Sequence, residues 1–215
     1  MKRYNVIIIL VLITVGIFYI DRGNAQENIA PNPPEKAAPA ETVILEDALP
    51  SGSQQEGEWI WDTNMKFSGT ASHIALEKEG PNQHGLKLTN PIKIKAGSYI
   101  IQYVYLDPKS PPNGLMMKFQ LSDGKETGVY WEGENEVFEI KENEDIWYIG
   151  FLPTKGEWVR LDIPTDDLDI QDKELTGISF IQHSGKVWWD KTSLSEEEAS
   201  NDSLRDDVRD LDYVD

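Results

Sequence analysis

The stretch SYIIQYVYLDPKSPPNGLMMKFQLSDGKETGVYWE, residues 98–132, decides the fold class of this chain. It contains three short runs rich in β-branched and aromatic residues, at 98–106, 115–122 and 128–132, and such runs favour β-strands. Turn sequences separate them, Pro-Pro-Asn-Gly after the first run and Asp-Gly after the second. No apolar stripe with the 3.6-residue period of a helix is present, so the sequence predicts consecutive strands.

The same pattern continues on both sides of this stretch. Further strands are predicted at residues 42–46, 58–62, 73–77, 86–89, 137–141, 146–152, 158–163, 176–183 and 186–190. Turn sequences follow several of them, with Ser-Gly at 68–69 and 184–185 and Lys-Gly at 155–156. Ten to twelve strands without a helix predict an all-β domain over residues 42–195, folded as a two-sheet, jelly-roll-like sandwich.

The N-terminus carries the features of an export signal. Lys2 and Arg3 precede an apolar run at residues 6–20, and small residues at 23–25 offer a cleavage site before Gln26. Residues 1–25 are therefore predicted to be a signal peptide, and the alternative is an uncleaved signal anchor, a helix that holds the protein at the membrane. Both alternatives predict an extracytoplasmic protein that is secreted, periplasmic or displayed at the cell surface.

Two flexible segments are predicted around the sandwich. Residues 26–41 are rich in Pro and Ala and read as an extended linker. Residues 196–215 contain nine acidic and two basic residues and form an acidic tail, either disordered or able to fold on a basic partner. The net charge of the whole chain is -18, which argues against binding to nucleic acid, because phosphate contacts need Lys or Arg.

No motif in the sequence points to catalysis. The chain has no cysteine, which excludes thiol chemistry, disulfides and thiolate zinc sites. The histidines, His73, His84 and His183, have no metal-binding spacing, and no nucleophile elbow or phosphate-binding loop is present. We expect His73 and His84 to bond to loop backbone or to each other across neighbouring strands. The chain is therefore predicted not to be an enzyme.

Aromatic residues are the strongest functional signal in the sequence. Seven Trp are many for 215 residues, and a sandwich core accommodates only part of them. Adjacent pairs, such as Tyr130 with Trp131, must place one ring on each face of a strand. Exposed aromatic area marks interaction sites, and flat rings stack on the apolar faces of sugars. The candidate ligand-binding residues are Trp59, Trp61, Tyr105, Trp131 and Trp188.

Two acidic residues are the candidate calcium ligands. Asp62 and Asp190 each follow a Trp-rich run, Trp-Ile-Trp at 59–61 and Trp-Trp at 188–189. If the first and last strands of a jelly roll pair, these two carboxylates come together, and carboxylate oxygens are the ligands that Ca²⁺ prefers. The alternative is two ordinary acidic residues at strand ends. No other cofactor is predicted.

Residues 67–190 resemble a jelly-roll module, similar to galactose-binding and lectin-like sandwiches, of bacterial extracytoplasmic proteins. The matching stretches are FSGTASH at 67–73, QH at 83–84, YVYLDPKSPP at 103–112, LP at 152–153, GEWVRL at 156–161 and WD at 189–190. Such modules are attached to haem-c-bearing, planctomycete-type surface proteins or to Rhs-type repeat chains. The resemblance implies a non-catalytic accessory domain. The chain departs from the family in its aromatic- and histidine-rich strand, of which Tyr130 and Trp131 remain, and it lacks a haem-attachment motif.

Two functional hypotheses follow from these observations. The first is a binding module of the cell envelope that recognises a glycan or another envelope polymer through exposed aromatics. The alternative is a structural or adaptor protein of the envelope that acts through protein–protein contacts and its acidic tail. In either case the only membrane contact is the N-terminal segment, if it stays uncleaved.

Overall fold

The computed structural model describes residues 41–75 and 77–196. The predicted signal segment, nearly all of the linker and nearly all of the acidic tail lie outside these residues. The described chain forms twelve strands: β1 (Glu41–Leu45), β2 (Gln54–Gly57), β3 (Ile60–Asp62), β4 (Ser72–Ile74), β5 (Pro81–Lys93), β6 (Tyr99–Leu106), β7 (Gly114–Leu121), β8 (Glu126–Glu132), β9 (Asp145–Phe151), β10 (Trp158–Pro164), β11 (Glu174–His183) and β12 (Val187–Ser195). The prediction of an all-β domain is confirmed.

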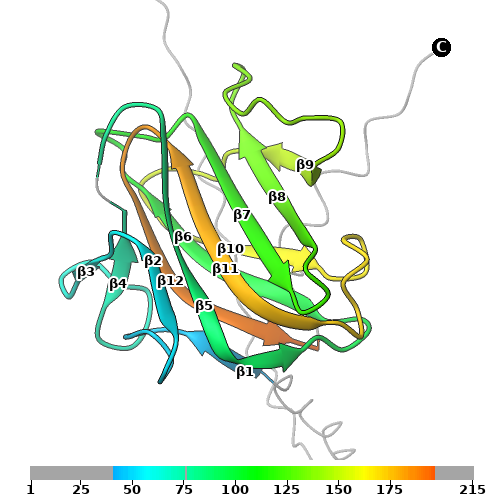
Figure 1. Cartoon of the computed structure of the whole chain (residues 1–215). Helices are drawn as coiled ribbons and strands as arrows, with labels where there is room; N and C mark the ends of the chain where they lie inside the picture. The colour runs from blue at the N-terminus through cyan, green and yellow to red at the C-terminus, as the bar shows by residue number, and fades with distance from the viewer. Residues whose placement is uncertain (1–40, 76, 197–215) are drawn as a thin grey trace, which may run out of the picture. The chain divides into compact units, whose positions relative to one another are not determined.

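The strands form two six-stranded sheets that make a sandwich. Sheet A has the order β10-β6-β12-β4-β3, with β1 also paired to β12. Sheet B has the order β2-β5-β11-β7-β8-β9. Figure 1 shows β5, β11, β7 and β8 side by side, with β9 beyond β8. The strand pairings are antiparallel except that of β8 with β9, which is parallel. β9 is the last strand in the order, so it forms an edge of sheet B.

The period-2 alternation of the strands builds the core between the sheets. In β7, Leu115, Met117 and Phe119 belong to the core, whereas Lys118 between them is only half-buried on the opposite face. Sheet A contributes Val104 and Leu106 from β6 and the fully buried Trp189 from β12, among others.

In the part of the chain that the structure describes, no helix is long and apolar enough to cross a membrane.

Two elements differ from the sequence-based prediction. The predicted strand at 137–141 does not form, although its apolar residues alternate, because the segment crosses the outer face of sheet B and pairs with no strand. Conversely, β2 was not predicted, since its sequence Gln-Gln-Glu-Gly carries no apolar signal. It forms because β5 extends well beyond the predicted residues 86–89 and offers a pairing edge.

The predicted turns serve two different purposes. Asp123-Gly124 joins the paired strands β7 and β8, and Gly124 adopts the positive φ of 83° that such a turn requires. The Ser-Gly turn at 184–185 instead leads from β11 in sheet B to β12 in sheet A. The turns at 111–114 and 155–156 also lead from one sheet to the other. Local turn chemistry predicts where the chain reverses, but not whether the next strand pairs with the previous one.

A histidine pair joins the two sheets inside the core. His73 Nδ1 of β4 and His84 Nε2 of β5 are 2.7 Å apart, so the predicted bond between these histidines forms, but between facing sheets and not between neighbouring strands. The other ring nitrogens, His73 Nε2 and His84 Nδ1, are buried without a hydrogen-bond partner in the described structure. Burial lowers the pKa of His84 to about 3, and burial followed by the proximity of His84 lowers the pKa of His73 well below its ordinary value.

Candidate ligand-binding groove

Three of the predicted ligand-binding residues pack toward the interior. Trp59 and Trp61 stack on each other at 5.6 Å, and both rings contact His73. The Trp59 indole N–H donates to the carbonyl oxygens of Glu56 and Gly85, at 3.1 and 3.0 Å. Trp131 is a core residue with 6% of its surface exposed. A ligand role for these three rings stays a prediction without support from their positions.

Tyr105 and Trp188 lie on the outer face of sheet A. In the register of the sheet, Trp158 of β10, Tyr105 of β6 and Trp188 of β12 stand in one row. The ring centroids of Tyr105 and Trp188 are 5.5 Å apart. Lys186 Nζ lies 4.3 Å from the Trp188 ring, which is only 8% exposed, so a cation already occupies that face of the indole.

The outer face of sheet B carries a second aromatic surface. Register aligns Ile181, Met116, Tyr130 and Tyr148 across β11, β7, β8 and β9. Residues directly opposite one another share a face of the sheet, so these four side chains form one apolar row. The rings of Tyr130 and Tyr148 are 5.4 Å apart. Of the adjacent pair in β8, Tyr130 is therefore the outward ring and Trp131 the inward one.

The connection between β8 and β9 forms a wall over this row. Phe138 lies over the outer face, 6.0 Å from the Tyr130 ring and 6.3 Å from the His183 ring. Its backbone N–H donates to Glu132 Oε1 at 2.9 Å, which ties the connection to the end of β8. A Cβ at Gly114 would lie 2.6 Å from the Phe138 ring, so the close approach of this ring needs a glycine in β7.

Between this wall and β9 lies a groove of about 960 Å³. It is lined by Tyr130, Glu132, Gly133, Glu134, Glu136, Phe138, Glu139, Ile140, Tyr148 and Phe151. Tyr148 is 51% exposed and Phe151 is 73% exposed, and exposed aromatic area of this kind marks interaction sites. The volume falls within the range of ligand-binding clefts, and the lining combines aromatic faces with polar groups.

Carboxylates dominate the electrostatics of the groove. Four of its lining residues are Glu, and none is Lys, Arg or His. Glu132 is 4% exposed and is held by the N–H of Phe138, whereas Glu134, Glu136 and Glu139 are exposed. Burial raises the pKa of the Tyr130 hydroxyl, and the charges of Glu132 and Glu136 raise it further.

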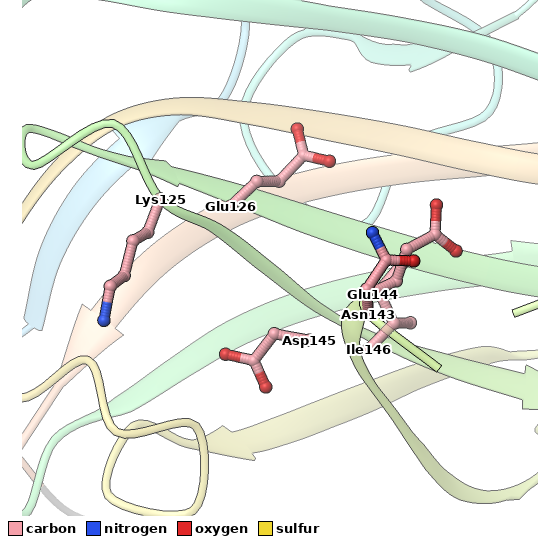
Figure 2. A pocket seen from close by; sticks show the side chains of 6 residues that line it. All are labelled: Lys125, Glu126, Asn143, Glu144, Asp145 and Ile146. Atoms are coloured by element: carbon pink, nitrogen blue, oxygen red, sulfur yellow. The ribbon is translucent and has the colours of Figure 1, made fainter. Parts of the chain in front are cut away.

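A smaller hollow of about 440 Å³ lies near the start of β8 and β9 and is also acidic. Its lining includes Glu126, Glu144 and Asp145. Figure 2 shows that the Lys125 ammonium group points away from the carboxylates of Glu126 and Glu144. The hollow is less acidic than the groove, because Lys125 lines it and Glu126 is paired with Lys118 at 3.1 Å.

The two candidate calcium ligands organise one loop, the connection between β3 and β4. Asp62 Oδ1 accepts the backbone N–H of Asn64 at 2.8 Å, and Asp62 Oδ2 accepts the Trp188 indole N–H at 2.9 Å. Asp190 Oδ2 accepts the N–H groups of Phe67 and Ser68, at 2.6 and 3.1 Å. The two residues do not lie on paired strands, as the calcium hypothesis expected, because β4 lies between β3 and β12 in sheet A.

The oxygens of these two residues differ in their availability to a cation. Both oxygens of Asp62 accept hydrogen bonds, whereas Asp190 Oδ1 is buried without a side-chain or backbone donor at hydrogen-bond distance and angle in the described residues. Burial raises the pKa of Asp190, its bonds from Phe67 and Ser68 lower it, and Glu46 raises it. No group of three or more His, Cys, Asp or Glu that could hold a metal ion occurs in the described residues. Calcium binding stays a prediction, and Asp190 fits it better than Asp62.

The comparison with known proteins gives no family for this chain. No family model and no curated protein matches the sequence. Among solved structures, the chain is similar to the CBM22-1 xylan-binding domain of Xyn10C from Paenibacillus barcinonensis, with 17% identity and a TM-score of 0.42 over 76% of this chain and 100% of that chain. A mutant of a family 29 carbohydrate binding module has 17% identity and a TM-score of 0.42 over 74% of this chain and 92% of that chain.

A third similar structure belongs to a larger protein. It is the glycoside hydrolase domain of Endo-D from Streptococcus pneumoniae R6, with 10% identity and a TM-score of 0.41 over 68% of this chain. The chain spans only 22% of that structure. Identities and TM-scores this low assign no ligand or activity to the chain, so its function is argued from the groove.

Proposed function

We propose that this chain is a non-catalytic, extracytoplasmic carbohydrate-binding module whose glycan lies in the groove on the outer face of sheet B. The observation that carries the proposal is the set of outward rings of Tyr130, Tyr148 and Phe151 in a groove of about 960 Å³. Pyranose rings have apolar C–H faces that pack on such rings, while the lining Glu residues accept hydrogen bonds from hydroxyls. This mode of binding needs no nucleophile, general acid or metal.

The exposure of the rings supports binding more than core packing. Phe151 and Tyr148 are held by an edge strand whose backbone is paired on one side only, by β8. Burying an aromatic side chain stabilises a fold by about 1.5–3 kcal/mol, which these exposed rings forgo. A ligand that covers them recovers this free energy on binding.

The chain offers a matched pair of variants for testing the groove. Tyr148 and Trp147 are neighbours in β9 with similar exposure, 51% and 53%, but Tyr148 lines the groove and Trp147 does not. The protein is titrated with a panel of polysaccharides, and binding is detected by calorimetry. At least one glycan should show saturable binding. Tyr148→Ala should weaken their binding about three- to tenfold, the size of one lost ring contact, and Trp147→Ala should leave it unchanged. Equal losses in both variants would place the ligand elsewhere.

The proposal includes an extracytoplasmic location and flexible segments on either side of the sandwich. The export signal, the linker and the acidic tail are supported by the sequence alone. The adaptor function, in which the tail captures a basic protein partner, is the alternative, and deletion of residues 196–215 would abolish that capture. The resemblance to modules of haem-c-bearing and Rhs-type proteins concerns the molecular context, which the groove does not address.

A calcium ion, if the protein takes one, would act on structure and not on the glycan. Asp190 would hold it through Oδ1, its buried second carboxylate oxygen. Its other oxygen already holds the loop that connects β3 and β4. The ion would supply positive charge that stabilises this loop against the repulsion between Asp190 and Glu46.

A further inference from the structure

We propose that the glycan of this groove carries free amino groups, as in a polymer of deacetylated amino sugars, so that it binds as a polycation. This inference rests on the proposed function and names the substrate class of the same site. It follows from three features of the groove: its charge, the kind of side chain that provides its surface, and the absence of compensating cations among its lining residues.

The charge of the groove has no counterpart in its own walls. Glu132, Glu134, Glu136 and Glu139 line it, with no Lys or Arg among the lining residues. None of the four forms a salt bridge with Lys or Arg among those found in the described residues. Two acids elsewhere on sheet B are paired with lysines, Glu56 with Lys87 at 2.8 Å and Glu126 with Lys118 at 3.1 Å. Glu132 is buried and accepts the N–H of Phe138, so the exposed carboxylates of Glu134, Glu136 and Glu139 are the ones left for a ligand.

The aromatic rings reinforce the preference for a cation. Tyr130, Phe138, Tyr148 and Phe151 surround the same space as the four carboxylates. The face of an aromatic ring is the negative part of its quadrupole and attracts an ammonium group. The combination of ring faces and carboxylates is therefore complementary to a sugar that has both a C–H face and a protonated amine.

The same charges disfavour the other charged glycans. A uronic acid or sulfated sugar would bring a negative charge beside Glu134, Glu136 and Glu139, and like charges repel. A neutral glycan could stack on the rings and donate hydroxyl hydrogen bonds to the carboxylates, but it would gain no attraction between opposite charges. The smaller hollow has the acidic residues Glu126, Glu144 and Asp145, but Lys125 also lines it and Glu126 is paired with Lys118 at 3.1 Å, so the inference rests on the groove.

Three tetrasaccharides of matched length test this inference on the full chain: tetraglucosamine, tetra-N-acetylglucosamine and tetragalacturonate, at about pH 6 where the amines are protonated. We expect tetraglucosamine to bind about tenfold more tightly than its acetylated counterpart, because three exposed charge contacts contribute about 0.5 kcal/mol each and together about one factor of ten. Raising the salt concentration should reduce this difference, since exposed charges are screened. Tetragalacturonate should not bind.

A triple variant separates groove charge from total charge. Glu134→Gln, Glu136→Gln and Glu139→Gln together should remove the preference for tetraglucosamine and leave the binding of the acetylated sugar unchanged. The control combines Glu58→Gln, Glu79→Gln and Glu157→Gln, three exposed residues outside the groove that change the net charge by the same amount. It should keep the preference.

The possible outcomes distinguish this inference from the function on which it rests. Equal or tighter binding of tetra-N-acetylglucosamine or tetragalacturonate overturns the amino-sugar inference and leaves the carbohydrate-binding function intact. An equal loss of preference in both triple variants also overturns it, because the effect would then come from net charge. Failure of every glycan in a broad panel to bind overturns the proposed function, and the inference with it.

Discussion

The histidine pair in the core predicts how the stability of this protein depends on pH. His84 has its pKa lowered to about 3 by burial, from an ordinary value of 6.5. Below pH 6.5 the unfolded chain takes up a proton at this position and the folded chain does not. Above pH 6.5, His84 therefore causes no loss of stability. Below pH 6.5, the free energy of unfolding falls as the pH decreases toward the pKa of His84 in the folded protein. His73 adds a loss of the same sign, since its pKa is lowered for the same reason.

The size of the effect follows from the separation of the two pKa values. Between about pH 7.5 and about pH 5, His84 alone should lower the free energy of unfolding by about 2 kcal/mol, since each pH unit below 6.5 costs about 1.4 kcal/mol. This window keeps the acidic side chains with lowered pKa values, Glu41, Asp47 and Asp62, ionised in both states, so they contribute little. A domain with a total stability of about 5–15 kcal/mol should show such a loss clearly.

Urea denaturation at the two pH values, followed by tryptophan fluorescence, measures this loss. In the His84→Gln variant, the Gln side chain keeps a nitrogen near the position of Nε2 for the bond to His73, but it does not titrate. The decrease in the free energy of unfolding between the two pH values should therefore be about 2 kcal/mol smaller in this variant than in the unaltered protein. His183→Gln is the control, because His183 is only half-buried at the end of β11. A wild-type loss below about 0.5 kcal/mol, or equal losses in wild type and His84→Gln, would refute the reasoning.

Two further predictions concern the wall of the groove and the candidate calcium ligand. Gly114→Val should displace Phe138, because even a Cβ at this position would lie 2.6 Å from the ring, and limited proteolysis should then cut faster within residues 133–144. Gly133→Ala, where a Cβ meets nothing within 4 Å, should not change the cleavage, and unchanged cleavage in Gly114→Val would contradict this packing. Calcium at about 100 times its dissociation constant should stabilise the unaltered protein by about 2.7 kcal/mol and Asp190→Asn much less, as measured by thermal unfolding. Equal responses of the two proteins to calcium, including none, would rule out Asp190 as its ligand.

The sequence predicted the positions of the strands along the chain better than it predicted which strands pair in the sheets. Alternation of apolar and polar residues and the turn sequences placed β6, β7, β8 and β10 within a residue or two of their observed bounds. They could not show that the turn at 184–185 passes between sheets, because the same Ser-Gly chemistry reverses the chain in either case. The strand β2 was missed for the opposite reason, since pairing with β5 creates it without an apolar signal of its own.

The candidate site illustrates the same limit at the level of single side chains. The sequence indicated that Tyr130 and Trp131 face opposite sides of one strand, and this is what the structure has. It did not indicate which of the two rings faces outward. The prediction named Trp131 as a candidate ligand-binding residue, but Trp131 lies in the core. Tyr148 and Phe151 could have been found from the unusually apolar run Ile146–Phe151, had β9 been recognised as an edge strand.

By itself, the sequence determined the all-β class, the absence of cysteine chemistry and the excess of aromatic residues. The tertiary structure alone decided which rings are exposed, that the segment at 137–141 covers a sheet face and that His73 meets His84 across the sandwich. The physical reason is that the two-residue period of a strand sets which residues share a face. Which of the two faces becomes buried depends on the sheet that packs against the strand, and residues distant in the chain form that sheet.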